Sequence, residues 1–187
     1  MIQESIYIGK EASTLVSKNP ADVRSLITIG RLPPDRWQDF KKIRLEALET
    51  EPYAFLSSSS DEEKFPEATW RERMPNHIFA RNGSDVIGLI GLIFRAREKQ
   101  KHIADIFSLY VRKEFRGKGI GNLLLMEALN VISSRGGISK IELSVMADQK
   151  PAIALYEKNG FMHARVLARE MFVNGSFHDE VLMEKLL

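Results

Sequence analysis

The sequence predicts one α/β domain in which helices flank a mixed central β-sheet. Two kinds of pattern predict this fold. Residues 102–135 read as an apolar strand, a glycine-rich turn and a helix, and residues 138–159 repeat the strand and the helix. Strands joined through a helix are expected to be parallel. Asn82-Gly83 and Asn174-Gly175 each separate two strand-like runs, and Asn-Gly is the strongest short signal for an antiparallel hairpin.

Each element is predicted from local periodicity and from the residues at its ends. Apolar side chains recur at helical spacing after Pro33-Pro34, where proline suits a first turn. Gly136-Gly137 suits the position just past a helix C-terminus. The expected elements are a strand at 26–32, a helix at 34–49, a serine-rich loop at 57–60, a helix at 66–73, strands at 78–81, 86–94 and 102–111, a helix at 120–135, a strand at 138–146, a helix at 149–159, and strands at 161–172 and 180–187. Their order is β-α-α-β-β-β-α-β-α-β-β.

Composition excludes several classes of function. The 187 residues suit a single domain, placed at 26–187 behind an N-terminal extension at 1–25. The net charge of +2 gives little attraction to nucleic acid. The chain has no cysteine, and its four histidines lack metal-ligand spacing, so we expect no metal. With no apolar run of about 18 residues and no signal-peptide core, we expect a cytoplasmic protein without a membrane partner. The sequence leaves open whether the protein forms a homodimer.

The stretch from Arg116 to Gly121, read RGKGIG, has the features of a phosphate site. It leads directly into a helix, so several backbone N–H groups at the helix start lack an acceptor, and the helix dipole adds positive charge there. Its glycines carry no Cβ, so an anion can approach the backbone closely. Four basic side chains are expected to add charge around it: Arg112, Lys113, Arg116 and Lys118.

Two common nucleotide motifs do not fit this loop. A Walker A loop requires Ser or Thr after the lysine, where this chain has Gly119. A dinucleotide fingerprint that began at Gly117 would need glycine where Asn122 stands. The pattern R-x-x-G-x-G, carried by Arg116, Gly119 and Gly121, does fit.

This pattern resembles the pyrophosphate-binding loop of the GNAT superfamily, the acyl-CoA-dependent N-acyltransferases. Two more segments carry the resemblance. LYV at 109–111 is similar to the family's central strand, and PAIALYEKNGF at 151–161 is similar to its second signature, a helix that ends in Y-E-K-x-G-F. The resemblance covers residues 26–187 and is specific over 105–161. It implies a GNAT-type α/β sandwich and acetyl-CoA as co-substrate.

The resemblance also implies which residues bind the coenzyme. The pantetheine arm would pair with the backbone of residues 109–111, and the Val111 N–H would donate to the thioester oxygen. The pyrophosphate would lie on the backbone amides of residues 116–122. Gln149 stands where relatives often carry an Asn that contacts the CoA arm. The implied cofactor-binding residues are Leu109, Tyr110, Val111, Arg116, Gly117, Lys118, Gly119, Ile120, Gly121, Asn122 and Gln149.

N-acetyl transfer requires an acid for the departing thiolate and a route by which the amine loses a proton. Tyr156 occupies the family's general-acid position, and a phenol is protonated at neutral pH. Asp105 lies where the histone-acetylating branch carries a glutamate base, and it would act through a water. Glu142 is a second choice of base, and a water chain is a third. One acidic run is either a solvated surface or a site for a cationic acceptor: Asp61, Glu62 and Glu63.

We therefore expect an N-acetyltransferase in which a small-molecule or peptide amine attacks acetyl-CoA directly. The sequence does not choose the amine. An alternative of a different class is a sensor or interaction module that binds CoA without turnover. A nucleic-acid binder built on residues 112–118 is a third interpretation, and the balanced net charge argues against it.

Overall fold

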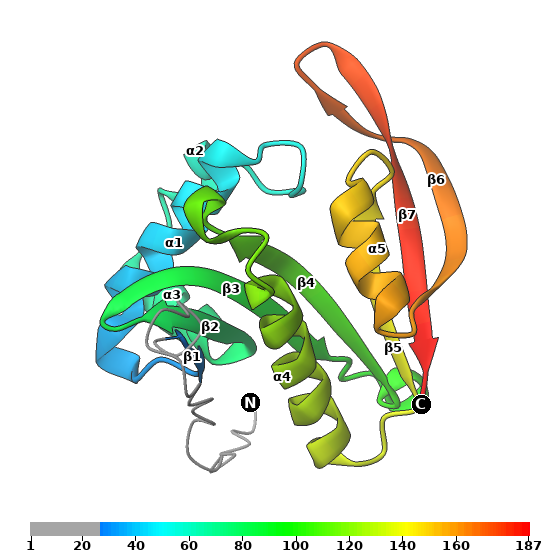
Figure 1. Ribbon diagram of the computed structural model, residues 1–187, viewed down its shortest axis with the longest axis horizontal. Coiled ribbons are helices and arrows are strands. Elements are labelled where there is room, and N and C mark those ends of the chain that lie inside the picture. Colours follow the sequence, from blue (N-terminus) through cyan, green and yellow to red (C-terminus); the bar gives the residue numbers. More distant parts are fainter. Residues whose placement is uncertain (1–26) are drawn as a thin grey trace.

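The computed structural model describes residues 27–187 (Figure 1). The predicted extension at residues 1–25 lies outside the described residues. The strands are β1 (Ile27–Gly30), β2 (His77–Asn82), β3 (Asp85–Phe94), β4 (Ile103–Val111), β5 (Lys140–Met146), β6 (Met162–Val173) and β7 (Ser176–Leu186). The helices are α1 (Trp37–Thr50), α2 (Ser59–Glu62), α3 (Glu67–Arg73), α4 (Ile120–Arg135) and α5 (Lys150–Lys158), with short 3-10 turns η2 (Pro34–Arg36), η3 (Met74–Asn76), η4 (Glu98–Gln100) and η5 (Lys113–Phe115).

The strands form one open sheet in the order β1-β2-β3-β4-β5-β7-β6. β4 and β5 run parallel, and every other neighbouring pair is antiparallel. The predicted mixed sheet is therefore confirmed. The parallel pair arises because α4 crosses from the end of β4 to the start of β5.

Two hydrophobic clusters pack on opposite faces of the sheet. Along β2, Ile78 and Ala80 belong to the cluster that includes α4 and α5, whereas Phe79 belongs to the cluster that includes α1 and α3. Because successive side chains of a strand point to opposite faces, α4 and α5 cover one face of the sheet, and α1 and α3 cover the other. Both faces of β2 are buried for this reason.

Two predictions of local structure are wrong. Residues 59–62 form the short helix α2 instead of continuing the serine-rich loop, because the Ser58 hydroxyl caps the helix by accepting the Asp61 amide at 3.2 Å. Strand β7 begins at Ser176 instead of residue 180. Asn174 and Gly175 have φ of 49° and 79°, so a tight two-residue turn lets pairing begin at once.

The parallel contact between β4 and β5 is short. It consists of the pairs Ile103↔Lys140, Ala104↔Ile141 and Asp105↔Glu142, all at the beginning of the two strands. Beyond these pairs the strands diverge, and Figure 1 shows β5 staying with β7 while β4 follows β3. The second half of β4 therefore has no strand partner on its β5 side.

A bulge in β4 lies within this unpartnered half. Leu89 pairs with Tyr110 and Gly91 with Phe107, so β4 has one residue more than β3 between these pairs. Ser108 in the bulge has φ of 56°, in the left-handed region. Glycine at position 88 permits the close approach of the strands, because a Cβ there would lie 2.7 Å from the Tyr110 carbonyl oxygen.

Candidate active site

The start of α4 presents backbone amides in the way the sequence predicts. Gly119 precedes the helix with φ of 80°, and its carbonyl accepts the first helical bond from the Leu123 amide at 3.1 Å. The amides of Ile120, Gly121 and Asn122 come before that bond and have no backbone acceptor among residues 27–187. Free amides at a helix start, together with the helix dipole, are the features that bind anions in proteins.

The loop before α4 uses its charged side chains differently from the prediction. The Arg116 guanidinium donates to the Val111 carbonyl at 2.7 Å and pairs with Glu51 at 2.7 Å. The Lys118 ammonium donates to the Glu114 carbonyl at 2.9 Å. The first of these bonds ties the loop to the end of β4, and the Lys118 bond lies within the loop.

Two groups that were predicted to contribute to the anion site have partners within the fold. Arg112 pairs with Glu46 of α1 at 2.8 Å and with Asp85 of β3 at 2.7 Å, so its charge is neutralised away from the loop. The Arg116 amide donates to the Lys113 carbonyl at 3.2 Å. The Arg116 amide is therefore engaged, whereas the amides of residues 120–122 have no backbone acceptor among the described residues.

The end of β4 directs a backbone N–H toward the diverging β5. The Arg112 amide donates to the Ile87 carbonyl of β3 at 2.9 Å. Because alternate residues of a strand direct their amides to opposite sides, the Val111 amide points away from β3 and toward the space between β4 and β5. The Tyr110 hydroxyl donates to Glu46 at 3.1 Å, so this side chain belongs to the α1 face, and only its backbone borders the space.

Tyr156 lies in α5 with its ring buried. The ring packs edge-to-face on Phe161, with the ring centroids 5.9 Å apart. Burial raises the pKa of the Tyr156 hydroxyl above its ordinary value. Among the described residues, no side chain or backbone group hydrogen-bonds to this hydroxyl.

Helix α5 lies beside the start of α4. The side-chain amide of Asn159 donates to the side-chain oxygen of Asn122 at 3.0 Å. A Cβ at Gly121 would lie 3.5 Å from the Leu155 side chain. The structure thus brings the helix that carries Tyr156 to the helix start that carries the amides. Gln149, the remaining predicted coenzyme contact, is half-buried just before α5, and its carbonyl accepts the Ala152 amide at 3.0 Å.

Asp105 lies at the paired end of β4, away from the diverging end. Both of its carboxylate oxygens accept hydrogen bonds from the Arg95 guanidinium, at 2.6 and 2.8 Å. Arg95 also donates to Glu142, which is the register partner of Asp105 on β5. The ion pairs continue through Lys140 to Glu184 of β7. This network joins β4, β5 and β7.

The acidic run at 61–63 is divided by the fold. Glu62 is buried and pairs with Arg44 at 2.7 Å and with Arg73 at 3.1 Å, so it neither faces solvent nor binds an acceptor. Burial by itself would raise its pKa, but hydrogen bonds from Arg44 and Arg73 lower the pKa of Glu62 to about 2. Arg44 also donates to the Ser108 hydroxyl at 2.8 Å, which connects this pair to the β4 bulge.

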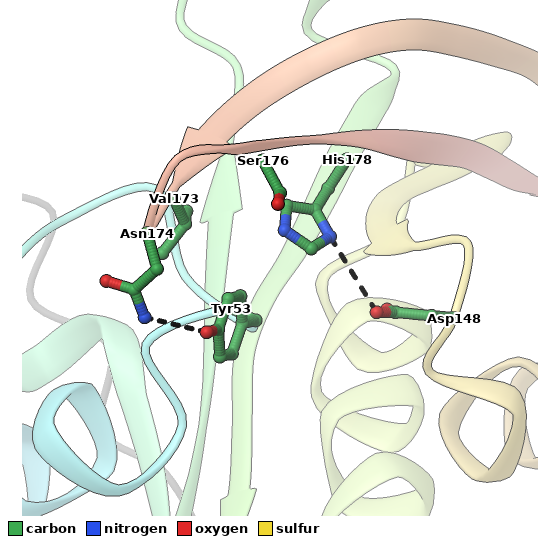
Figure 2. A pocket seen from close by; sticks show the side chains of 6 residues that line it. All are labelled: Tyr53, Asp148, Val173, Asn174, Ser176 and His178. Carbon is green, nitrogen blue, oxygen red and sulfur yellow. Dashed lines mark hydrogen bonds and ion pairs between the residues drawn. The ribbon is translucent and has the colours of Figure 1, made fainter.

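A small cavity of about 170 Å³ lies where three connections meet (Figure 2). Tyr53 comes from the connection between α1 and α2, and Asp148 from the connection between β5 and α5. Four residues come from the end of the β6–β7 hairpin: Val173, Asn174, Ser176 and His178. The side-chain amide of Asn174 donates to the Tyr53 hydroxyl at 2.7 Å. The ring centroids of Tyr53 and His178 are 5.2 Å apart.

The sequence analysis did not predict this cavity, nor the arginines that form ion pairs with Asp105 and Glu62. Tyr53 and Asn174 are far apart in the chain, and neither belongs to a motif, so only the fold brings them together. Within residues 27–187, no helix is long and apolar enough to cross a membrane. No group of His, Asp or Glu side chains in that range is arranged to hold a metal ion.

Comparison with known proteins places these features in a family. The sequence matches the Acetyltransferase (GNAT) family over residues 37–161. It is 26% identical to the L-amino acid N-acetyltransferase AaaT of Escherichia coli, over 63% of this chain and 75% of that protein. It is 32% identical to the spermidine N(1)-acetyltransferase of Vibrio cholerae, over 49% of this chain and 53% of that protein.

A solved structure shares the fold. The yncA protein of Salmonella typhimurium, determined with its cofactor acetyl-CoA, superposes with a TM-score of 0.70 at 19% identity. The match covers 86% of this chain and 94% of that one.

Proposed function

Because the chain belongs to the GNAT acetyltransferase family, we propose that it transfers the acetyl group of acetyl-CoA to a primary amine by direct attack of the amine on the thioester. The yncA structure with acetyl-CoA supports the choice of co-substrate. A direct attack suits a chain without cysteine, since no acyl-cysteine intermediate can form.

One observation carries this proposal: the amides that begin α4 lie beside the unpartnered half of β4. The amides of Ile120, Gly121 and Asn122 would hold the diphosphate of the coenzyme. The free edge of β4 at residues 109–111 would pair with the pantetheine arm, as a further strand would. These backbone groups fit a long coenzyme with a diphosphate at one end and amides along its arm.

The chain's own groups would then act on the reacting atoms. The Val111 amide would donate to the thioester oxygen, where negative charge develops as the amine attacks. The Tyr156 hydroxyl would give its proton to the departing sulfur, and its raised pKa keeps it protonated at neutral pH.

The proton of the amine has two candidate receivers. Asp105 is the base predicted from the sequence, but its two oxygens accept hydrogen bonds from Arg95, so a base role requires that this ion pair opens. Water between the diverging strands is the other receiver. The bonding of Asp105 favours water.

The test is release of free CoA thiol from acetyl-CoA across a panel of primary amines, together with calorimetric titration of acetyl-CoA. We expect binding and amine-dependent thiol release. Binding without turnover on any amine would instead favour a CoA sensor. Absence of binding would reject both functions.

A further inference from the structure

The cavity in Figure 2 lies at the end of β5 that has diverged from β4, the region in which the reaction is proposed to occur. β4 and β5 pair only from Ile103↔Lys140 to Asp105↔Glu142 and diverge beyond these pairs. Asp148 follows the last residue of β5, Met146, by two positions. Asp148 lines the cavity, so the cavity borders the open end of the diverging strands.

The cavity is lined by one carboxylate and by no lysine or arginine among the described residues. Asp148 supplies the carboxylate, and its side chain is 62% exposed. The Nδ1 atom of His178 lies 3.9 Å from this carboxylate.

Two arginines on segments that neighbour the cavity have guanidinium groups engaged by other partners. The Arg169 guanidinium lies 4.2 Å from the Phe177 ring centroid. Phe177 and His178 are consecutive on β7, so their side chains are on opposite faces, and Arg169 is on the face away from the cavity. Arg116 is engaged by Glu51 and by the Val111 carbonyl. Neither guanidinium is available to an acceptor in the cavity.

Further negative charge lies on the same face of β7. Glu180 is two residues beyond His178, is nearly buried, and pairs in register with Met146 at the end of β5. Burial and repulsion by Glu170 raise the pKa of Glu180, although a hydrogen bond from Ser144 partly offsets this.

We propose that the acceptor is a cationic amine without a carboxylate beside the reacting amino group, such as a diamine, a polyamine or an amino-acid amide. This inference rests on the proposed function and names its substrate class. An ammonium group in the cavity would be attracted by Asp148 and would stack against the Tyr53 ring. The carboxylate of a free amino acid would meet Asp148 with no cation to balance it.

A matched pair of acceptors tests the proposal. L-leucinamide and L-leucine have the same side chain and differ only in the carboxylate, and 1,4-diaminobutane and butylamine differ in the second ammonium. At pH 8 we expect leucinamide and the diamine to have the higher kcat/KM in each pair. Preference for leucine over leucinamide would overturn the inference while the acetyltransferase function stood.

Asp148→Asn separates the effect of the cavity from the intrinsic reactivity of the amines. The variant should reduce each preference about tenfold, because one charge is removed from a partly exposed site. Asp35→Asn is the control: it removes the same charge from an exposed position at the other end of α1 from Tyr53, and both preferences should be unchanged.

Two outcomes would count against the proposal at different levels. Preferences that are equal in wild type and Asp148→Asn would overturn the assignment of the cavity as the acceptor site. Acetyl-CoA binding with no turnover of any of the four amines would overturn the proposed function, and the acceptor class with it.

Discussion

The two ends of β4 are held by different kinds of group. At its beginning, side-chain charges join it to β5: Arg95 connects Asp105 to Glu142, and Lys140 continues the network. At its end, β4 has no partner on the β5 side, and what borders the open space is main chain, the Val111 amide and the amides that begin α4. The comparison teaches that side chains hold this fold closed at one end, whereas backbone donors are available to a ligand at the other.

The largest expected effect comes from the buried ion pair of Glu62 and Arg44, which contacts the β4 bulge through Ser108. Glu62→Gln would leave Arg44 buried without its counter-charge, and we expect the free energy of unfolding to fall by about 3 kcal/mol or more. Urea unfolding at pH 7 measures this. Glu63→Gln, one residue along at an exposed position, is the control and should change stability little.

The same pair predicts a pH dependence of stability. The pKa of Glu62 is lowered to about 2 in the folded chain from an ordinary value of 4.5. Its stabilisation is therefore fully present above pH 4.5 and is lost as the pH falls toward 2. The difference in stability between wild type and Glu62→Gln should shrink over this range, and a constant difference would contradict the account.

The next largest effect is expected at the start of α4, which borders the open end of β4. Gly119→Glu sets a carboxylate beside the amides that begin α4, and we expect acetyl-CoA to bind at least about a hundredfold more weakly. Calorimetry measures the affinity. Gly136→Glu is the control for a glutamate added at a positive-φ glycine, because Gly136 has φ of 72° and lies at the other end of α4, away from these amides. Equal affinity in the two variants would reject the anion site.

A smaller effect is expected at the hydroxyl of α5. Tyr156→Phe should lower kcat about thirtyfold and leave the affinity for acetyl-CoA nearly unchanged, because only the proton donor is removed. Tyr110→Phe serves as the control, since the Tyr110 hydroxyl bonds to Glu46 and Thr50 on the α1 face. An unchanged kcat in Tyr156→Phe would remove its acid role.

The smallest effect on kcat is expected at the paired end of β4, where Asp105 lies. Asp105→Asn should lower kcat by about threefold or less, with the same ratio to wild type at every pH, because Arg95 occupies its carboxylate. The pH profile of kcat in wild type and in the variant measures this ratio. A loss that deepens at low pH would restore Asp105 as the base.

Most of the fold could be predicted from the sequence because its signals are local. The Asn-Gly turns, the helical spacing after Pro34 and the glycines that begin and follow α4 each act within a few residues. The start of α4 could be predicted for the same reason, since the site there consists of backbone amides whose position depends on one turn.

The side-chain partners could not be predicted. Arg95 meets Asp105 across a sheet register, and Glu62 meets Arg44 because α2 forms where a loop was expected. The cavity needs three connections that no periodicity relates, with Tyr53 and Asn174 separated by 121 positions. Partners so distant in the chain are chosen by packing of the whole domain.

The brief pairing of β4 with β5 has a thermodynamic consequence. The four strands on one side and the three on the other share only three register pairs, so the seam contributes few main-chain hydrogen bonds of its own. A coenzyme arm that bonds to the unpaired edge of β4 would add main-chain hydrogen bonds at the boundary between β4 and β5. Since the unfolded chain offers no such edge, saturating acetyl-CoA at a hundred times its Kd would raise the unfolding free energy by about 2.7 kcal/mol.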